Sequence, residues 1–131
     1  MEPWEALKKF NVIAVIGCST NPEKDAHTVP LYMKSHGYKI MPINPTASEI
    51  MGERAYKSLS EIKETIDIVN VFRPSEEVAG IVDQVLQRKD IKVIWTQLGI
   101  RDDSAAEKAK KHGVAVIQDV CIRVAHKMMR L

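Results

Sequence analysis

Cysteine is scarce in this sequence, and no arrangement of cysteine or histidine is typical of a metal site. Only Cys18 and Cys121 occur in 131 residues, too few for a scaffold held together by disulfides. The four histidines are scattered, with neither paired C-x-x-C spacings nor an H-E-x-x-H helix. These absences exclude a structural zinc site and disfavour a metal-dependent enzyme, so we expect no metal.

Long apolar runs and an excess of one charge are also absent. No run approaches the roughly 20 apolar residues that span a bilayer. The start, Met1 to Glu5, carries acids and a proline where a signal peptide needs basic and then apolar residues. We therefore expect a cytoplasmic protein with no membrane partner. With 19 Lys+Arg against 17 Asp+Glu, the net charge of +2 argues against a bulk nucleic-acid binder.

The sequence does have the composition of one ordinary domain. Its 131 residues are 45% hydrophobic and 27% charged, which is enough to build a core without disulfides or metals. No linker, low-complexity tract or internal repeat interrupts the chain. Residues 1–131 are therefore predicted to form a single domain.

Short β-branched runs alternate with longer amphipathic segments along the chain. The runs that predict strands are 12–16, 39–43, 66–72, 91–95 and 114–117. The segments that predict helices are 2–9, 27–36, 58–61, 75–88, 103–112 and 121–130, while 49–56 fits either a loop or a short added strand. Pro30 fits the helix 27–36 if it lies in the first turn. Several runs are apolar almost throughout, which is typical of parallel strands covered on both faces. The pattern predicts an α/β doubly wound, mainly parallel sheet of about five strands with helices on both faces.

Ligands of such sheets bind beyond the carboxyl ends of the strands, so the residues that follow each strand are the candidates. Gly17, Cys18 and Ser19 follow the first strand, with Lys24 a little further along. Glycine permits a tight turn, and hydroxyl, ammonium and N–H groups at a helix start favour a phosphate. An ordinary strand-to-helix turn with a surface lysine explains the same residues, and the sequence does not decide between the two interpretations.

Two common nucleotide-binding patterns are missing. The first loop is neither G-x-G-x-x-G nor a Walker A sequence. The second strand ends at Ile43-Asn44-Pro45, without the acidic residue that binds a ribose hydroxyl in dinucleotide sites. NAD binding, ATPase activity and kinase activity therefore lose their main support.

The third and fourth strand ends each offer groups that suit a ligand. Arg73, in the run 72–74, is placed to pair with a phosphate or a carboxylate, or else is simply solvated. The run 95–99 combines an aromatic ring, two hydrogen-bonding side chains and a glycine. In the alternative interpretation, Trp95 caps the core and Gln97 is merely exposed.

Taken in order, these four motifs resemble those of the single-domain CoA-binding proteins, which are similar to the N-terminal domain of the succinyl-CoA synthetase alpha subunit. The resemblance covers residues 5–130 and implies a Rossmann-like fold that binds coenzyme A or an acyl-CoA. The residues it implies are Gly17, Cys18, Ser19 and Lys24 at the phosphates, Asn44 and Pro45 at the adenosine, Phe72, Arg73 and Pro74 along the nucleotide and diphosphate, and Trp95, Thr96, Gln97, Leu98 and Gly99 beside the pantetheine.

Two features depart from the synthetase. Its catalytic phosphohistidine lies in a second domain that has no counterpart in this sequence, so synthetase activity is not implied. Arg73 stands where the synthetase has a proline-rich turn. The arginine either adds a phosphate contact or changes how the adenine sits.

Three functions stay open. The first is a CoA-binding carrier, sensor or regulator without catalysis of its own, in which Cys18 is only a small residue in a tight turn. The second is a thiol-dependent enzyme acting on a CoA thioester or CoA disulfide, in which Cys18 or Cys121 acts as a nucleophile and a helix N-terminus lowers the pKa of Cys18. The third is an NAD(P)-sensing domain, which the missing glycine fingerprint disfavours. A homo-oligomer or a partner protein also stays open.

Overall fold

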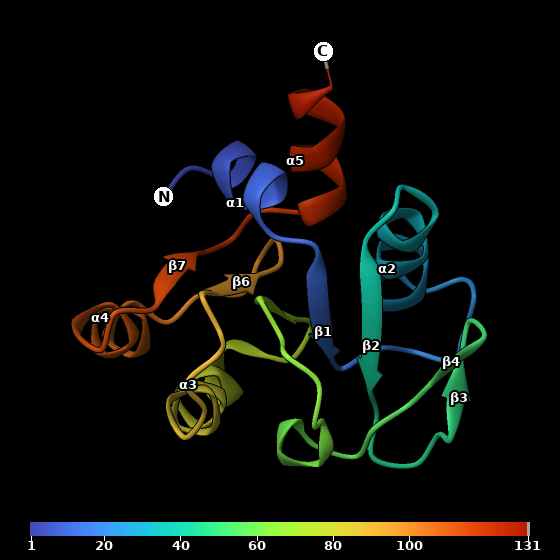
Figure 1. The fold of residues 1–131 in the computed structure, drawn as a ribbon, viewed down its shortest axis with the longest axis horizontal. Coiled ribbons are helices and arrows are strands. Elements are labelled where there is room, and N and C mark those ends of the chain that lie inside the picture. Colours follow the sequence, from blue (N-terminus) through green and yellow to red (C-terminus); the bar gives the residue numbers. More distant parts are fainter. Residues whose placement is uncertain (131) are drawn as a thin grey trace.

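The main sheet has five parallel strands in the order β2-β1-β5-β6-β7 in the computed structural model, which describes residues 1–130 (Figure 1). Its strands are β1 (Val12–Ile16), β2 (Lys39–Ile43), β5 (Ile68–Val71), β6 (Val93–Thr96) and β7 (Ala115–Ile117). The helices are α1 (Pro3–Lys9), α2 (Asp25–Ser35), α3 (Val78–Leu86), α4 (Asp103–Lys111) and α5 (Ile122–Met129). The predicted doubly wound, Rossmann-like α/β sheet is confirmed.

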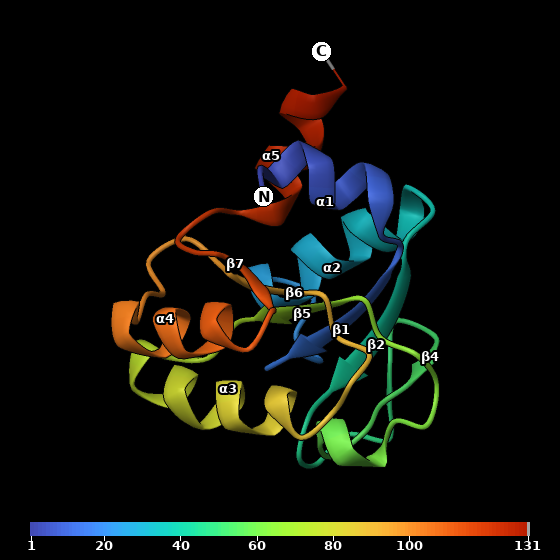
Figure 2. The ribbon, with the colours of Figure 1, turned by 60° about the vertical axis from the view of Figure 1, so that its left-hand side comes forward.

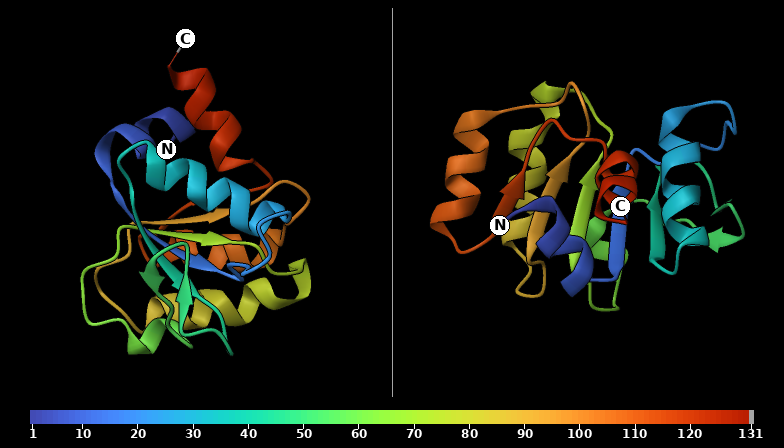
Figure 3. Two further views of the ribbon diagram at one scale, coloured as in Figure 1. Left: turned by 90° about the vertical axis from the view of Figure 1, so that its right-hand side faces the viewer. Right: turned by 90° about the horizontal axis from the view of Figure 1, so that it is seen from above.

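Helices cover both faces of the sheet. Helices α1, α2 and α5 lie on one face, and α3 and α4 lie on the other (Figure 2). Side chains alternate along each strand, so Ile13 and Ile68 pack under the first group of helices while Ala14 and Val69 pack under the second. The double coverage explains why the strands are apolar on both sides. Figure 3 shows the end of α5 extending beyond the rest of the ribbon.

The direction of winding reverses between β1 and β5. From β1 the chain crosses through α2 to β2 on one side, and it then returns to β5 on the other side of β1. The loops that follow β1 and β5 therefore leave the sheet toward opposite faces. A crevice opens between such diverging loops, and this is where open α/β sheets bind ligands.

Helix α2 differs from its sequence prediction at its start, and the structure settles the ambiguous segment 49–56. Helix α2 begins at Asp25, two residues before the predicted start, so Pro30 lies inside it and not in its first turn. The segment 49–56 forms a small antiparallel hairpin of β3 (Glu49–Ile50) and β4 (Glu53–Arg54). Just after β4, Tyr56 forms a parallel bridge to Ile43 at the end of β2.

Two single-turn 3-10 helices complete the fold, η1 (Leu59–Glu61) on the way to β5 and η2 (Ser75–Glu77) directly before α3. Leu59 and Ile62 are buried and pack η1 against the core beneath α3. The connection from β2 to β5 thus covers the sheet with a short turn in place of a long helix. Within residues 1–130, no helix is both long and apolar enough to cross a membrane.

Candidate functional site

A groove of about 650 Å³ opens at the carboxyl edge of the sheet, where the winding reverses. It lies between the loop after β1, the end of β2 and the start of α3, and it mixes apolar walls with charged and hydroxyl groups. Its lining consists of Ile16, Gly17, Cys18, Ser19, Lys24, Ala26, Ile43, Asn44, Pro45, Lys57, Ser58, Leu59, Phe72, Arg73, Glu77, Ile81 and Gln84. The structure thus brings the motifs of the first three strand ends together in one groove.

Backbone hydrogen bonds hold the loop after β1 in place. The N–H groups of Gly17 and Cys18 both donate to the carbonyl of Ile43, each at 3.2 Å. The N–H of Ser19 donates to the carbonyl of Ala26 at 3.0 Å. That carbonyl is free because its partner within the helix would be the N–H that Pro30 lacks. The proline inside α2 therefore anchors the loop to the helix that follows it.

Gly17 permits the close approach of the loops at the reversal point. Its φ is +89°, a conformation that side chains disfavour. A Cβ at this position would lie 2.9 Å from Cδ of Arg73 and 3.3 Å from the backbone carbon of Phe72. The aliphatic part of Arg73 therefore crosses the groove floor directly over Gly17, and only glycine leaves room for it.

The first turn of α2 borders the groove at Lys24, while Asp25, the acid of that turn, is not part of the lining. Lys24 is the N-cap residue, and no side chain caps the first N–H groups of the helix. The ammonium of Lys24 is exposed and takes part in no ion pair within residues 1–130. A free cation beside an uncapped helix start suits a phosphate, because the helix dipole and the N–H groups both attract an anion.

The amide of Asn44 is engaged mainly by contacts within the protein. Its Nδ2 donates to the carbonyl of Cys18 at 2.9 Å, which ties the end of β2 to the loop after β1. Its Oδ1 accepts the N–H groups of Thr46 and Ala47 at 2.9 and 3.0 Å. Asn44 therefore shapes the edge of the groove, with its amide oxygen engaged by the turn that follows and one bond from its amide nitrogen tying β2 to the loop after β1.

Arg73 is neither fully solvated nor free. Its Nε and Nη2 donate to the two carboxylate oxygens of Glu77, at 3.1 and 2.7 Å. These bonds lower the pKa of Glu77 and raise the pKa of Arg73. The guanidinium is half-exposed, so an anion entering the groove can bind its outer face while Glu77 holds it in place.

The predicted residues 95–99, at the end of β6 and directly after it, lie outside this groove, and Pro74 is not part of its lining either. Trp95 is completely buried and its indole N–H donates to the carbonyl of Val120 at 2.8 Å. Thr96 is also buried and donates to the carbonyl of Ile100. Leu98, in contrast, is 72% exposed, and Gly99 donates its N–H to the carboxylate of Asp119.

Gln97 is buried, which corrects the alternative that left it exposed. Its Oε1 accepts bonds from Nδ2 of Asn70 at 3.2 Å and from the N–H of Ile122 at 3.0 Å. Asn70 lies in the centre of the sheet, and its Oδ1 is buried without a partner within residues 1–130. Sequence reasoning overlooked Asn70, although a lone polar residue inside an apolar strand was the available signal.

Sequence reasoning also overlooked groove residues that do not directly follow a main strand. Lys57 lines the groove because the bridge between Tyr56 and Ile43 holds the preceding residue against the end of β2. Glu77, Ile81 and Gln84 reach it from η2 and α3. Their spacing of four and three residues on one helical face was a signal that could have identified them.

The thiol of Cys18 is neutral. The residue is 1% exposed, and burial raises its pKa to about 12, which overrides the effect of the nearby helix start. Cys121 is half-buried, and both cysteines are free. The burial and the raised pKa argue against the alternative of a reactive thiolate at Cys18, and they fit the interpretation as a small residue in a tight turn.

The two cysteines are expected to differ in alkylation. At pH 8, iodoacetamide should modify Cys18 roughly a thousandfold more slowly than an ordinary thiol, because so little thiolate forms. Cys121 provides the internal comparison, and denatured protein gives the rate for both. Peptide mass spectrometry over time measures the two sites. Rapid labelling of Cys18 in the folded protein would contradict its neutral, buried state.

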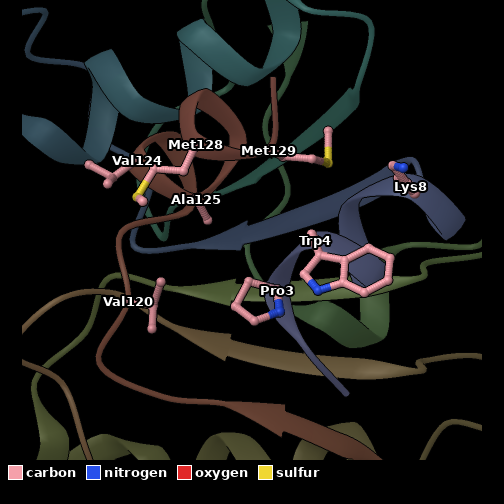
Figure 4. Close-up of a pocket in the computed structure, with 8 residues that line it drawn as sticks. All are labelled: Pro3, Trp4, Lys8, Val120, Val124, Ala125, Met128 and Met129. Atoms are coloured by element: carbon pink, nitrogen blue, oxygen red, sulfur yellow. The ribbon is translucent and has the colours of Figure 1, made fainter. Parts of the chain in front are cut away.

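A second groove of about 520 Å³ lies between α1 and α5 (Figure 4). It is lined mostly by apolar side chains, among them Trp4, Val124 and Met128, and Lys8 is its one charged residue. None of the residues predicted to bind a ligand lies there. A hollow with so few donors does not suit a ligand carrying several phosphates.

Comparison with known proteins agrees with this fold. A Bacillus subtilis protein, the uncharacterized protein YneT, is 42% identical over 126 residues, which cover 96% of this chain and 93% of that protein. The solved structure of cell-free ID.343 from Thermus thermophilus is 37% identical, with a TM-score of 0.90, over 98% of this chain and 99% of that one.

Longer enzymes contain a similar segment. The alpha subunit of an ADP-forming acetate–CoA ligase II from Pyrococcus furiosus is 28% identical over 122 residues, and the match covers 86% of this chain but only 27% of that subunit. The family model described as a CoA binding domain matches residues 11–127. The chain therefore belongs to the CoA-binding domain family.

Proposed function

We propose that the groove at the carboxyl edge binds coenzyme A or an acyl-CoA, and that the protein acts as a carrier, sensor or regulator without catalysis of its own. One observation carries the proposal. The groove gathers Lys24, Lys57 and Arg73 beside the uncapped start of α2, in a chain of the CoA-binding family. Cations and N–H groups of this kind match a ligand with a diphosphate and a phosphomonoester.

The lining suggests how the ligand lies. Ser19, Lys24 and the N–H groups at the start of α2 are suited to the diphosphate, with Arg73 on the opposite side. Apolar groups such as Pro45 and Phe72 are suited to the adenine. A groove of about 650 Å³ falls in the usual range for small-molecule sites, so it holds the nucleotide part while the pantetheine arm extends along the edge.

For the pantetheine arm we propose a path toward the end of β6. Pro74 and the exposed Leu98 and Gly99 lie on that side of the sheet edge, next to the Arg73 end of the groove. Trp95, Thr96 and Gln97 contribute there by holding the strand end rigid from beneath, because their side chains are buried and hydrogen-bonded. In this proposal they shape the path without facing the ligand.

The absence of catalysis is part of the proposal and rests on the groups that line the groove. They are cations, amides, hydroxyls and one neutral thiol, and the carboxylate of Glu77 is held by Arg73. A thiol enzyme needs a thiolate and a base beside it. The similar ligases carry out their reaction with chains several times longer than this one, so their activity is not transferred.

The proposed place of action is the cytoplasm, because two free cysteines suit a reducing compartment. A partner protein is also proposed. One similar protein is the alpha subunit of a ligase that has more than one subunit type, and a binding domain without chemistry needs a partner to pass on or report its ligand.

Calorimetric titration with CoA tests the proposed function. We expect saturable binding at one site per chain and no binding of NAD, which lacks the phosphomonoester. The Lys24→Ala variant should bind CoA about tenfold to a hundredfold more weakly, because it loses a charge-assisted bond to phosphate. Lys110→Ala, on the exposed side of α4, removes the same charge outside the groove and should bind normally. Absence of CoA binding to the wild type contradicts the proposal, and an unchanged Lys24→Ala affinity contradicts the role of Lys24.

A further inference from the structure

Lys57 stands at the end of β2 although it is distant from that strand in sequence. The N–H of Tyr56 donates to the carbonyl of Pro42, and the N–H of Asn44 donates to the carbonyl of Tyr56, both at 2.9 Å. Through this parallel bridge, Tyr56 pairs with Ile43 on the outer edge of β2, the edge strand of the sheet. Lys57 follows Tyr56 as Asn44 follows Ile43, so the two side chains lie next to each other on the edge of the groove.

The end of this strand has a general role in doubly wound sheets. The adenosine ribose of a bound dinucleotide lies there, where an acidic side chain binds an unmodified ribose hydroxyl and a cationic one accommodates a ribose phosphate. Here the position directly after β2 is Asn44, an uncharged residue whose amide bonds the carbonyl of Cys18 and the turn that follows. The one carboxylate in the groove, Glu77, is held by Arg73.

Lys57 is the cation at this position that is free to bind. It is exposed, it lines the groove, and it takes part in no ion pair within the described residues 1–130. Lys24 lies on the other side of the end of β2, at the start of α2. The groove therefore offers two anion positions, one at Lys24 by the helix start and a second at Lys57, where the ribose of a bound nucleotide would lie.

We infer that Lys57 binds the 3′-phosphate of the adenosine ribose and makes the groove select CoA over dephospho-CoA. The inference rests on the proposed function and adds a specificity residue to it. A phosphomonoester carries a charge of about −1.5 to −2 at pH 7, so the ammonium of Lys57 gains far more from it than from a ribose hydroxyl. Lys24 and the start of α2 then serve the diphosphate, which both ligands share.

The test is a comparison of two ligands on four proteins. CoA and dephospho-CoA are titrated calorimetrically into the wild type, Lys57→Ala, Lys57→Arg and the matched surface variant Lys110→Ala. The wild type should bind CoA at least about tenfold more tightly than dephospho-CoA. Lys57→Ala should lose about tenfold to a hundredfold in CoA affinity while its dephospho-CoA affinity changes by less than about threefold. Lys57→Arg should keep the preference, and Lys110→Ala should match the wild type.

Adenosine 3′,5′-bisphosphate and adenosine 2′,5′-bisphosphate, used as competitors, separate the two possible ribose phosphates. The 3′-phosphorylated compound should displace CoA more effectively, and the difference should disappear in Lys57→Ala. Equal wild-type affinity for CoA and dephospho-CoA, an equal loss of both ligands in Lys57→Ala, or better competition by the 2′-phosphorylated compound each overturns the inference. If neither CoA nor dephospho-CoA binds the wild type, the proposed function itself fails.

Discussion

The Trp95→Ala variant is expected to lose about 3–5 kcal/mol of unfolding free energy, the usual range for a large aromatic residue removed from a core. Trp95 is completely buried in the core beneath α1, α2 and α5. Truncation leaves a cavity in the middle of β6, and it also leaves the carbonyl of Val120 without the indole N–H that donates to it at 2.8 Å. Urea unfolding followed by circular dichroism measures the change.

Two further variants make the result specific. Leu98→Ala, three residues along and 72% exposed, should change stability by less than about 0.5 kcal/mol. Trp95→Phe keeps most of the apolar volume but loses the N–H, so it should fold and cost about 1–3 kcal/mol. A Trp95→Ala variant as stable as the wild type would contradict the buried position of this side chain.

The affinity of Trp95→Phe for CoA separates the two interpretations of the strand end. If Trp95 only supports the edge from beneath, the affinity of the folded variant should stay within about threefold of the wild type, since distant changes couple weakly. A loss greater than about tenfold with intact stability would place Trp95 against the ligand. Calorimetry on the same samples gives the answer.

The sheet could be predicted from the sequence because parallel strands are apolar on both faces. Runs such as Val12 to Ile16 are typical of strands buried on both sides, and a segment of helical period follows most of them. The irregular parts were less predictable. Pro30 suggested a helix start, but the N–H of Ser19 in the loop donates to the Ala26 carbonyl that the proline leaves unpaired, and this bond lets α2 begin earlier.

The candidate site was predictable only as far as it follows from strand order. The ends of β1, β2 and β5 meet at the reversal point, so the residues that follow these strands had to come close together. Whether a side chain at a strand end faces the groove or the core is decided by its partners. For Gln97 those partners are Asn70 and the N–H of Ile122, both 25 or more residues away in sequence.

The groups that join the site from elsewhere had no local signal. Lys57 follows a two-stranded hairpin whose pairing could not be distinguished from a loop, and the bridge from Tyr56 to Ile43 depends on that hairpin. Arg88 is a second example. In the sequence it is an ordinary charged residue at a helix end, yet in the structure it is the centre of a hydrogen-bonded cluster.

Arg88 holds the segment after η1 against the end of α3. Its Nη1 donates to the carbonyls of Leu59 and Ile62 at 2.9 and 2.8 Å, and its Nη2 donates to that of Glu64 at 3.1 Å. The guanidinium also binds both carboxylate oxygens of Asp90, at 3.0 and 2.8 Å. Leu59 lines the groove, so this cluster supports one of its walls.

The Arg88→Ala variant is expected to be less stable by about 3 kcal/mol, because it leaves a largely buried carboxylate without its cation and the carbonyls of Ile62 and Glu64 without their donor. The side chains of Arg88 and Asp90 are only 17% and 23% exposed. Arg101→Ala is the matched control, since its ion pair with Asp103 is 56% and 75% exposed and should contribute less than about 1 kcal/mol. Urea unfolding at pH 7 compares the three proteins, and an equal small loss in both variants would contradict the role of the cluster.

At acidic pH, the difference in unfolding free energy between the wild type and Arg88→Ala should become smaller. Hydrogen bonds from Arg88 lower the pKa of Asp90 to about 2 in the folded protein, whereas an aspartate in the unfolded chain keeps its ordinary pKa of 3.8. The folded state therefore binds fewer protons in this window, and the stabilisation is complete above about pH 4 and is lost as the pH falls toward about 2. A shift of this size corresponds to about 2–3 kcal/mol at neutral pH. Because Arg88→Ala lacks the donor that causes the shift, its stability should fall less over the same pH range, and parallel acid profiles for the two proteins would show that Arg88 does not hold Asp90 ionised.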